Sequence, residues 1–176
     1  MAPRFPLYID LNGSLCVVVG GGVVATRRAE ALLRCGAKVR VIAPAFSEAL
    51  VAWCAAETVF CGRLELVERV FRDADVDSAR LVVAATDRTE VNARIAFLSA
   101  EKHIPVNISD APEKSTFYFP ALITRGDLCV GVNSAGASPS ASKQIREIIE
   151  MMLPEDLGQR IAELGDLRNG AKEDLT

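Results

Sequence analysis

The chain has 176 residues, of which half are apolar and 24% are charged, and its formal net charge is −3. This length predicts one main domain with a small appendage, and this composition is typical of a globular fold. A slightly acidic chain lacks the basic surface that nucleic acid or an anionic membrane would need, so we expect neither as a partner. Because no apolar run approaches the roughly 20 residues of a membrane-spanning helix, the sequence favours a cytoplasmic protein.

The cysteines and the histidine argue against two kinds of site. The five cysteines form no C-x-x-C pair, and His103 is the only histidine. A zinc site would need such pairs or a histidine cluster, and a Ser–His–Asp triad would depend on His103. We therefore expect no metal site built from protein ligands.

The first 110 residues alternate between short β-like runs and helical segments. Helices are expected over residues 23–35, 46–56 and 91–100, and strands at Leu15–Val19, Val39–Ala43, Leu64–Val67, Leu81–Ala85 and Ile104–Ile108. Such alternation is typical of βαβ units, in which helices cover both faces of a parallel sheet. Residues 1–110 are therefore predicted to form a Rossmann-like, doubly wound α/β domain.

The pattern changes after residue 110. Two β-like runs, Phe117–Thr124 and Leu128–Asn133, are separated by a tight-turn sequence and predict an antiparallel hairpin. We expect residues 111–168 to form a small hairpin and helical unit for dimerisation and substrate binding, followed by a flexible tail at 169–176.

Two helices are predicted after the hairpin. Ser138 and Pro139 are suited to the N-cap and to the first position of a helix that runs to about Leu153. Pro154 then begins a second, shorter helix.

A glycine-rich turn lies between the first expected strand and the first expected helix. Residues 20–25 read Gly-Gly-Gly-Val-Val-Ala, which matches the dinucleotide-binding pattern G-x-G-x-x-A. Gly20 permits a tight turn, Gly22 lets a pyrophosphate approach the backbone, and Ala25 lets helix and sheet pack closely. The alternative is a glycine turn that merely connects strand and helix.

The end of the second strand leaves the choice between NAD and NADP open. An acid that binds the adenosine ribose is usual about 20 residues after the glycine turn. Here residues 41–45 read Val-Ile-Ala-Pro-Ala, with neither an acid nor a basic residue for a 2′-phosphate.

Two carboxylates follow strands of the predicted sheet. Asp87 comes after the fourth strand and Asp110 after the fifth, and ligands of doubly wound sheets bind outside the carboxyl ends of the strands. Each carboxylate also has a structural interpretation. Thr86 and Asp87 would suit the N-cap region of the next helix, and Asp110 would suit an Asx turn before Pro112.

Several sequence blocks occur in the order of one enzyme family. They are Phe-Pro-Leu-Tyr-Ile-Asp-Leu at 5–11, the glycine turn, Ala-Ala-Thr-Asp at 84–87, Val-Asn-Ile-Ser-Asp-Ala-Pro at 106–112, Phe-Pro-Ala at 119–121 and Gly-Ala-Ser-Pro at 136–139. Over about residues 3–165 the chain resembles the N-terminal module of the siroheme synthase family, a precorrin-2 dehydrogenase and sirohydrochlorin ferrochelatase. The resemblance implies oxidation of precorrin-2 to sirohydrochlorin with NAD, followed in many members by insertion of ferrous iron.

The resemblance also directs us to site residues. Asp110 matches the key aspartate of the family and would accept the proton that precorrin-2 loses on oxidation. Arg125 and Lys143 are the preferred cations for a carboxylate-rich tetrapyrrole, and a homodimer is expected. The expected dinucleotide contacts are Gly20, Gly21, Gly22, Val23, Val24, Pro44, Ala45, Thr86 and Asp87.

Alternatives to this interpretation stay open. A regulatory sensor module would bind NAD without turnover and would need no catalytic carboxylate. A second alternative, within the enzyme class, is an enzyme that oxidises precorrin-2 but does not insert metal. His103 is a weaker candidate for the base, and a surface histidine before the fifth strand is the structural interpretation of it.

Overall fold

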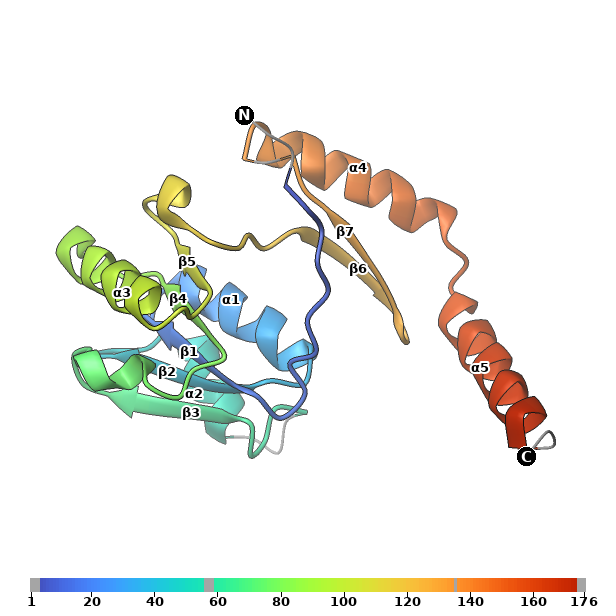
Figure 1. Cartoon of the computed structure of the whole chain (residues 1–176), viewed down its shortest axis with the longest axis horizontal. Helices are drawn as coiled ribbons and strands as arrows, with labels where there is room; N and C mark the ends of the chain where they lie inside the picture. The colour runs from blue at the N-terminus through green and yellow to red at the C-terminus, as the bar shows by residue number, and fades with distance from the viewer. Residues whose placement is uncertain (1–3, 56–58, 135, 174–176) are drawn as a thin grey trace. The chain divides into compact units, whose positions relative to one another are not determined.

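The computed structural model describes residues 4–55, 59–134 and 136–173 and divides into two compact units (Figure 1). The first unit spans residues 6–118 and contains a five-stranded sheet, whereas the hairpin and the last two helices belong to the second unit. This architecture confirms the expected Rossmann-like sheet followed by a hairpin and helical unit. No helix in the described segments has both the length and the apolar character needed to cross a membrane.

All strand pairs of the first unit are parallel, and the strand order is β3-β2-β1-β4-β5. The elements are β1 (Leu15–Val19), α1 (Val23–Arg34), β2 (Lys38–Ala43), α2 (Glu48–Ala55), β3 (Leu64–Glu68), η1 (Asp73–Val76), β4 (Leu81–Ala84), α3 (Thr89–Glu101), β5 (Val106–Ile108) and η2 (Pro112–Lys114). Chain order reverses between β1 and β4, and ligands of doubly wound sheets bind at the carboxyl ends of the strands at such a reversal. The residues that follow β1, β2, β4 and β5 therefore define the place to look for a site.

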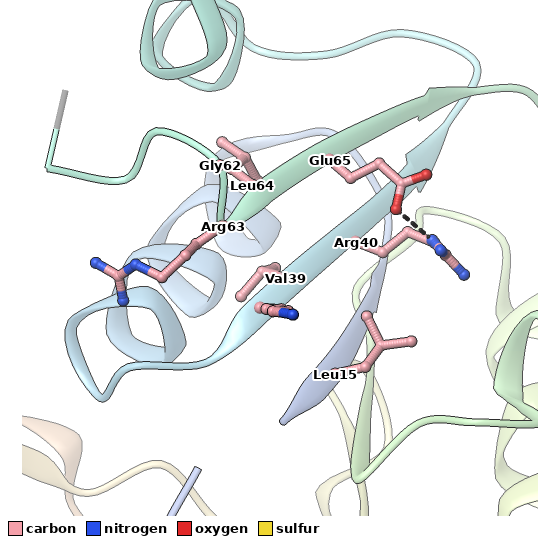
Figure 2. Close-up of a pocket in the computed structure, with 8 residues that line it drawn as sticks. Leu15, Val39, Arg40, Gly62, Arg63, Leu64 and Glu65 are labelled. Atoms are coloured by element: carbon pink, nitrogen blue, oxygen red, sulfur yellow. Dashed lines mark hydrogen bonds and ion pairs between the residues drawn. The ribbon is translucent and has the colours of Figure 1, made fainter. Parts of the chain in front are cut away.

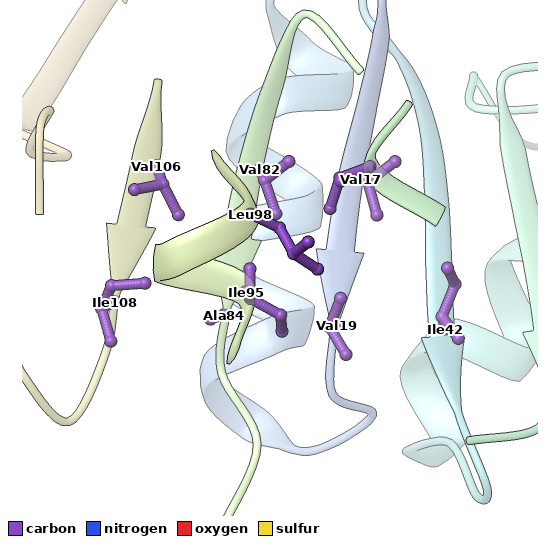
Figure 3. Packing of buried hydrophobic residues seen from close by; sticks show 10 residues of the cluster. Val17, Val19, Ile42, Val82, Ala84, Ile95, Leu98, Val106 and Ile108 are labelled. Atoms are coloured by element: carbon purple, nitrogen blue, oxygen red, sulfur yellow. The ribbon is translucent and has the colours of Figure 1, made fainter. Parts of the chain in front are cut away.

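Apolar side chains on both faces of the sheet form the core of the first unit. Figure 3 shows Ile95 and Leu98 of α3 against strand side chains that include Val17 and Val82. Successive strand residues point to opposite faces, so Cys16 belongs to the face covered by α1. Burial raises the pKa of the Cys16 thiol to about 12, with a smaller contribution from Cys35. Cys16 is therefore a neutral, apolar core residue.

The second unit is a hairpin with two helices. β6 (Ala121–Arg125) and β7 (Leu128–Val132) are antiparallel, and Gly126 adopts φ 56° in the turn that joins them. α4 (Pro139–Met152) packs against both strands, and the hydroxyl of Ser138 accepts a hydrogen bond of 3.2 Å from the Ala141 N–H. The prediction of an N-cap at Ser138 is confirmed.

Several helix and strand boundaries differ from the predictions, and the first hairpin strand begins at Ala121 rather than at Phe117. α5 (Leu157–Glu173) has 17 residues against 14 in α4, so the prediction of a shorter second helix was wrong. It continues through residues 169–173 of the expected tail, past Asn169 and Gly170, although such residues commonly end a helix; residues 174–176 lie outside the described part of the chain. β5 begins two residues later than expected, after Pro105, which has no N–H to donate to a neighbouring strand. α2 begins at Glu48 rather than at residue 46, and residue 56 of the expected helix is not described.

Candidate functional site

The first two glycines of the turn after β1 lie against neighbouring loops. A β-carbon built on Gly20 would stand 2.2 Å from the carbonyl oxygen of Ala85, and one built on Gly21 would stand 1.9 Å from that of Ala45. Gly20 also has φ 123°, a conformation that other residues rarely adopt. No side chain fits at either position unless the backbone moves.

Gly22 has a different environment. It is the N-cap of α1 with φ −86°, which any residue adopts, and a β-carbon there would have no neighbouring atom of the described residues within 4 Å. The space beside Gly22 is therefore open, and it adjoins the first turn of α1, where backbone N–H groups have no partner within the helix. Such a cradle fits the pyrophosphate of a dinucleotide.

The loop from β2 to α2 is tied to this turn by hydrogen bonds. The Ser47 N–H donates to the Gly21 carbonyl oxygen at 2.8 Å, and the hydroxyls of Ser47 and Thr26 are 2.8 Å apart. Pro44 and Ala45, two of the expected dinucleotide contacts, are exposed in this loop. Thr26 and Ser47 were not predicted, since hydroxyl contacts between distant loops leave no periodic signal.

The beginning of α1 carries positive charge. Arg27 and Arg28 lie in its second turn, close to the open space beside Gly22 in sequence. Burial, and to a smaller extent the charge of Arg27, lower the pKa of Arg28. The helix dipole and these two guanidinium groups favour an anion at the amino end of α1.

A buried amide joins the carboxyl ends of β4 and β5. Asn92 of α3 is 1% exposed, and its Nδ2 donates to Oδ1 of Asp110 at 2.9 Å and to the carbonyl oxygen of Thr86 at 3.0 Å. Its Oδ1 accepts from the Thr86 hydroxyl at 2.8 Å and from the Thr86 N–H at 3.3 Å. Asp110 itself is exposed. Asn92 was not predicted, although a polar residue in line with Ile95 and Leu98 is a signal that could have revealed it.

The structural interpretations of the two carboxylates have different outcomes. Thr86 and Asp87 directly precede Arg88, the N-cap of α3, and the Thr86 hydroxyl accepts a hydrogen bond of 3.1 Å from the Arg88 N–H, so they do lie in the N-cap region. An Asx turn at Asp110 would need the N–H of the residue two positions on, which is Pro112 and has none. Asp87 is exposed in the loop after β4. The expected assignments of Asp87 and Asp110 to a ligand site stay predictions.

His103 lies away from these residues. It is exposed, has φ 53°, and precedes β5, whereas Asp110 follows it. The two residues therefore occupy opposite ends of one strand. This position agrees with the interpretation of His103 as a surface residue.

The two cations chosen for the substrate lie in the second unit and face carboxylates. Nη1 of Arg125 is 3.5 Å from Glu150, and the Lys143 ammonium is 3.8 Å from Glu147, with the Lys143 side chain 72% exposed. The Lys143 pair is a surface pair of the kind that contributes little to stability, whereas the Arg125 side chain is only 26% exposed. Their role toward a substrate stays a prediction.

A shallow pocket lies at the other edge of the sheet, at the amino ends of β1, β2 and β3 (Figure 2). An ion pair of 2.7 Å between Arg40 and Glu65 spans its wall. Ligands of parallel sheets bind at the opposite edge, and the pocket holds none of the predicted site residues. Among the described residues, no cluster of three or more His, Cys, Asp or Glu could hold a metal ion.

Residues 7–121 match the protein family described as putative NAD(P)-binding, so the chain belongs to this NAD(P)-binding family. It is also similar to siroheme synthases, and the resemblance seen in its sequence blocks is confirmed. Identity is 39% over 170 residues with the siroheme synthase of Escherichia coli O157:H7, covering 97% of this chain and 36% of that protein. With that of Methylobacillus flagellatus it is 36% over 168 residues, covering 96% and 35%.

Among solved structures, the chain resembles one titled SirC, precorrin-2 dehydrogenase. The TM-score is 0.75 at 29% identity, and the match covers 94% of this chain and 79% of that one. The chain spans about a third of the length of the curated siroheme synthases that it matches.

Proposed function

We propose that this chain catalyses the NAD-dependent oxidation of precorrin-2 to sirohydrochlorin, a step of siroheme biosynthesis. The observation that carries the proposal is the position of Asp110, an oriented carboxylate after β5, at the same edge of the sheet as the open space beside Gly22. The names of the siroheme synthases and of the SirC structure support the substrate. A sensor module would need the glycine turn but not this carboxylate.

The loop after β2 favours NAD over NADP. Its residues Pro44 and Ala45 are exposed and uncharged, and Glu48 begins α2 just beyond them. The 2′-phosphate that NADP carries on its adenosine ribose would meet the carboxylate of Glu48 there rather than a cation. We therefore assign NAD as the cofactor. It would contact the glycine turn and this loop, and Val23, Val24, Thr86 and Asp87 are its further expected contacts.

The oxidation needs a proton acceptor supplied by the protein. Oxidation removes one hydride and one proton from precorrin-2, and NAD⁺, held by the glycine turn and the loop after β2, would supply the acceptor for the hydride. The carboxylate of Asp110 accepts the proton. Because Oδ1 of Asp110 already accepts the Asn92 amide, we assign the proton to Oδ2. The exposure of Asp110 then lets the proton pass to water.

The proposed substrate and assembly involve the second unit. A carboxylate-rich tetrapyrrole needs cations, and Arg125 and Lys143 are those that we assign. α4 exposes apolar side chains along one side, and a second copy of the chain would cover them. We propose a homodimer in the cytoplasm. The exposed apolar residues are Ile145, Ile148, Met151 and Met152.

Insertion of ferrous iron into sirohydrochlorin is a second step that the same carboxylate supports, since two pyrrole N–H protons must leave. The test is to mix the protein with sirohydrochlorin and Fe²⁺ and to compare the rate of siroheme formation with the rate without protein. Faster formation supports the step. Equal rates would remove metal insertion from the proposal and leave the oxidation.

The proposal is tested by mixing the protein with precorrin-2 and NAD⁺ and recording the absorbance of sirohydrochlorin and NADH. We expect both products in equal amounts. NADP⁺ in place of NAD⁺ should react more slowly. A folded protein that binds NAD⁺ but forms neither product would favour the sensor alternative.

A further inference from the structure

We propose that Asn92 is a positioning residue of this site, one that orients the carboxylate of Asp110 and ties it to the loop at Thr86. The inference rests on the proposed function, because it assigns Asp110 the role of proton acceptor. It concerns a residue on α3 that does not itself reach the substrate.

The contacts of Asn92 use the whole hydrogen-bonding capacity of its side chain. An asparagine amide has two N–H donors and two acceptor positions. One donor goes to Asp110 and the other to the Thr86 carbonyl, while the oxygen accepts from the Thr86 hydroxyl and the Thr86 N–H, at distances between 2.8 and 3.3 Å. With every position occupied, the amide has a single orientation, and it presents an N–H to Asp110.

The burial of Asn92 indicates that packing alone does not explain it. Its side chain is 1% exposed, one helical turn from Ile95, where an apolar residue would suit the core. A buried amide must keep its hydrogen bonds to avoid a penalty. The bonds it makes hold two loops at the carboxyl ends of β4 and β5, which is where a ligand of this fold binds.

The amide suits a proton acceptor better than a charged partner would. It has no titratable proton, so it orients Asp110 without competing for the proton that Asp110 is to receive. An arginine or lysine would neutralise the carboxylate and weaken it as a base. Because Thr86 is also an expected dinucleotide contact, the same amide sets the spacing between the cofactor loop and the base.

A double-mutant cycle tests the role. Asn92→Asp keeps the shape and the bonds accepted from Thr86, but it replaces by an oxygen the Nδ2 that donates to Asp110 and to the Thr86 carbonyl. At saturating precorrin-2 and NAD⁺, we expect single-turnover formation of NADH to slow by about 10- to 100-fold. In the Asp110→Ala background the same substitution should change the rate by less than about twofold. An equal slowing in both backgrounds would mean a general structural role and would overturn the inference.

Ser99→Ala is the matched control, since Ser99 is a buried polar residue of the same helix that lies two turns from Asn92. It should leave the rate and the affinity for NAD⁺ unchanged. If wild-type protein forms no product, the proposed function fails. A second measurement, which needs no activity, still tests whether Asn92 donates its hydrogen bond to Asp110.

The second measurement does not depend on the folding of an Asn92 variant. In ¹⁵N-labelled protein, the side-chain NH₂ resonances of Asn92 are recorded for wild type and for Asp110→Ala, which changes an exposed residue. We expect one of the two protons to shift and to exchange faster with water when its acceptor is removed. Unchanged resonances would overturn the inference, whatever the activity.

Discussion

The carbonyl oxygen of Ala45 lies over Gly21, 1.9 Å from the point at which a β-carbon on Gly21 would stand. At the adjacent Gly22, no atom in the described part of the chain lies within 4 Å of the corresponding point. Two consecutive glycines thus meet different requirements: Gly21 makes room for the protein's own backbone, and Gly22 leaves room that the protein does not fill. We therefore expect a substitution at Gly21 to affect folding and a substitution at Gly22 to affect ligand binding.

Gly22→Ala is expected to weaken binding and to leave the fold intact. Its φ of −86° suits alanine, so the thermal midpoint should stay close to that of wild type. The added methyl group would enter the space that we assign to the pyrophosphate. We expect the dissociation constant of NAD⁺ to rise about tenfold or more, or about 1.4 kcal/mol, as measured by calorimetry. Wild-type affinity would show that the dinucleotide lies elsewhere.

Gly21→Ala is the matched comparison, and here we expect the free energy of unfolding to fall. The β-carbon would overlap a backbone oxygen, which no side-chain rotation relieves. Overpacking of this kind costs about 2 kcal/mol. Urea unfolding should show the loss in the absence of any ligand. If Gly21→Ala were as stable as Gly22→Ala, the loop after β2 would not lie over the turn as described.

Asp75 gives a prediction about pH. Its carboxylate accepts hydrogen bonds of 2.6 and 2.8 Å from Arg69, and its side chain is 8% exposed. The bond with Arg69 holds the pKa of Asp75 below its usual range, although burial opposes this. A lowered pKa in the folded state contributes stability above the unfolded value of about 3.9, and that stability is lost as pH falls through the folded value.

Asp75→Asn should therefore lower the free energy of unfolding by about 2 kcal/mol at pH 7 and by less at pH 2.5. Urea unfolding at the two pH values measures both differences. Asp77→Asn is the control, because Asp77 is 55% exposed and its pair with Lys102 is a surface ion pair of 2.9 Å, worth about 0.5 kcal/mol or less. If Asp75→Asn lowered the free energy of unfolding equally at both pH values, the lowered pKa assigned to Asp75 would be contradicted.

The apolar side of α4 predicts the oligomeric state. Ile148 is 53% exposed and Met151 is 80% exposed, and a monomer rarely leaves such side chains in a row uncovered. Wild-type protein should sediment as a dimer at micromolar concentration, and Ile148→Lys with Met151→Lys should sediment as a monomer. Val70→Lys, which changes an exposed valine of the first unit, should not alter the sedimentation. A monomeric wild type would contradict the proposed homodimer.

The sequence predicted the elements of the fold better than the connections between them. Alternating strands and helices, the glycine turn and the N-cap at Ser138 are local patterns, and each is present in the structure. The length of α5 escaped prediction because Asn169 and Gly170, residues that commonly end a helix, lie within it. The bond from Asn92 to Asp110 joins residues 18 positions apart on different elements, so only the tertiary structure brings them together.

Asp110→Ala gives the most direct test of the proton-transfer site. The variant is compared with wild type for turnover of precorrin-2 and for NAD⁺ affinity, in the same preparation. We predict that turnover falls by about 10²-fold or more, the range expected for loss of a general base, and that the dissociation constant of NAD⁺ stays the same. An Asp110→Ala protein that oxidises precorrin-2 at the wild-type rate would contradict the account.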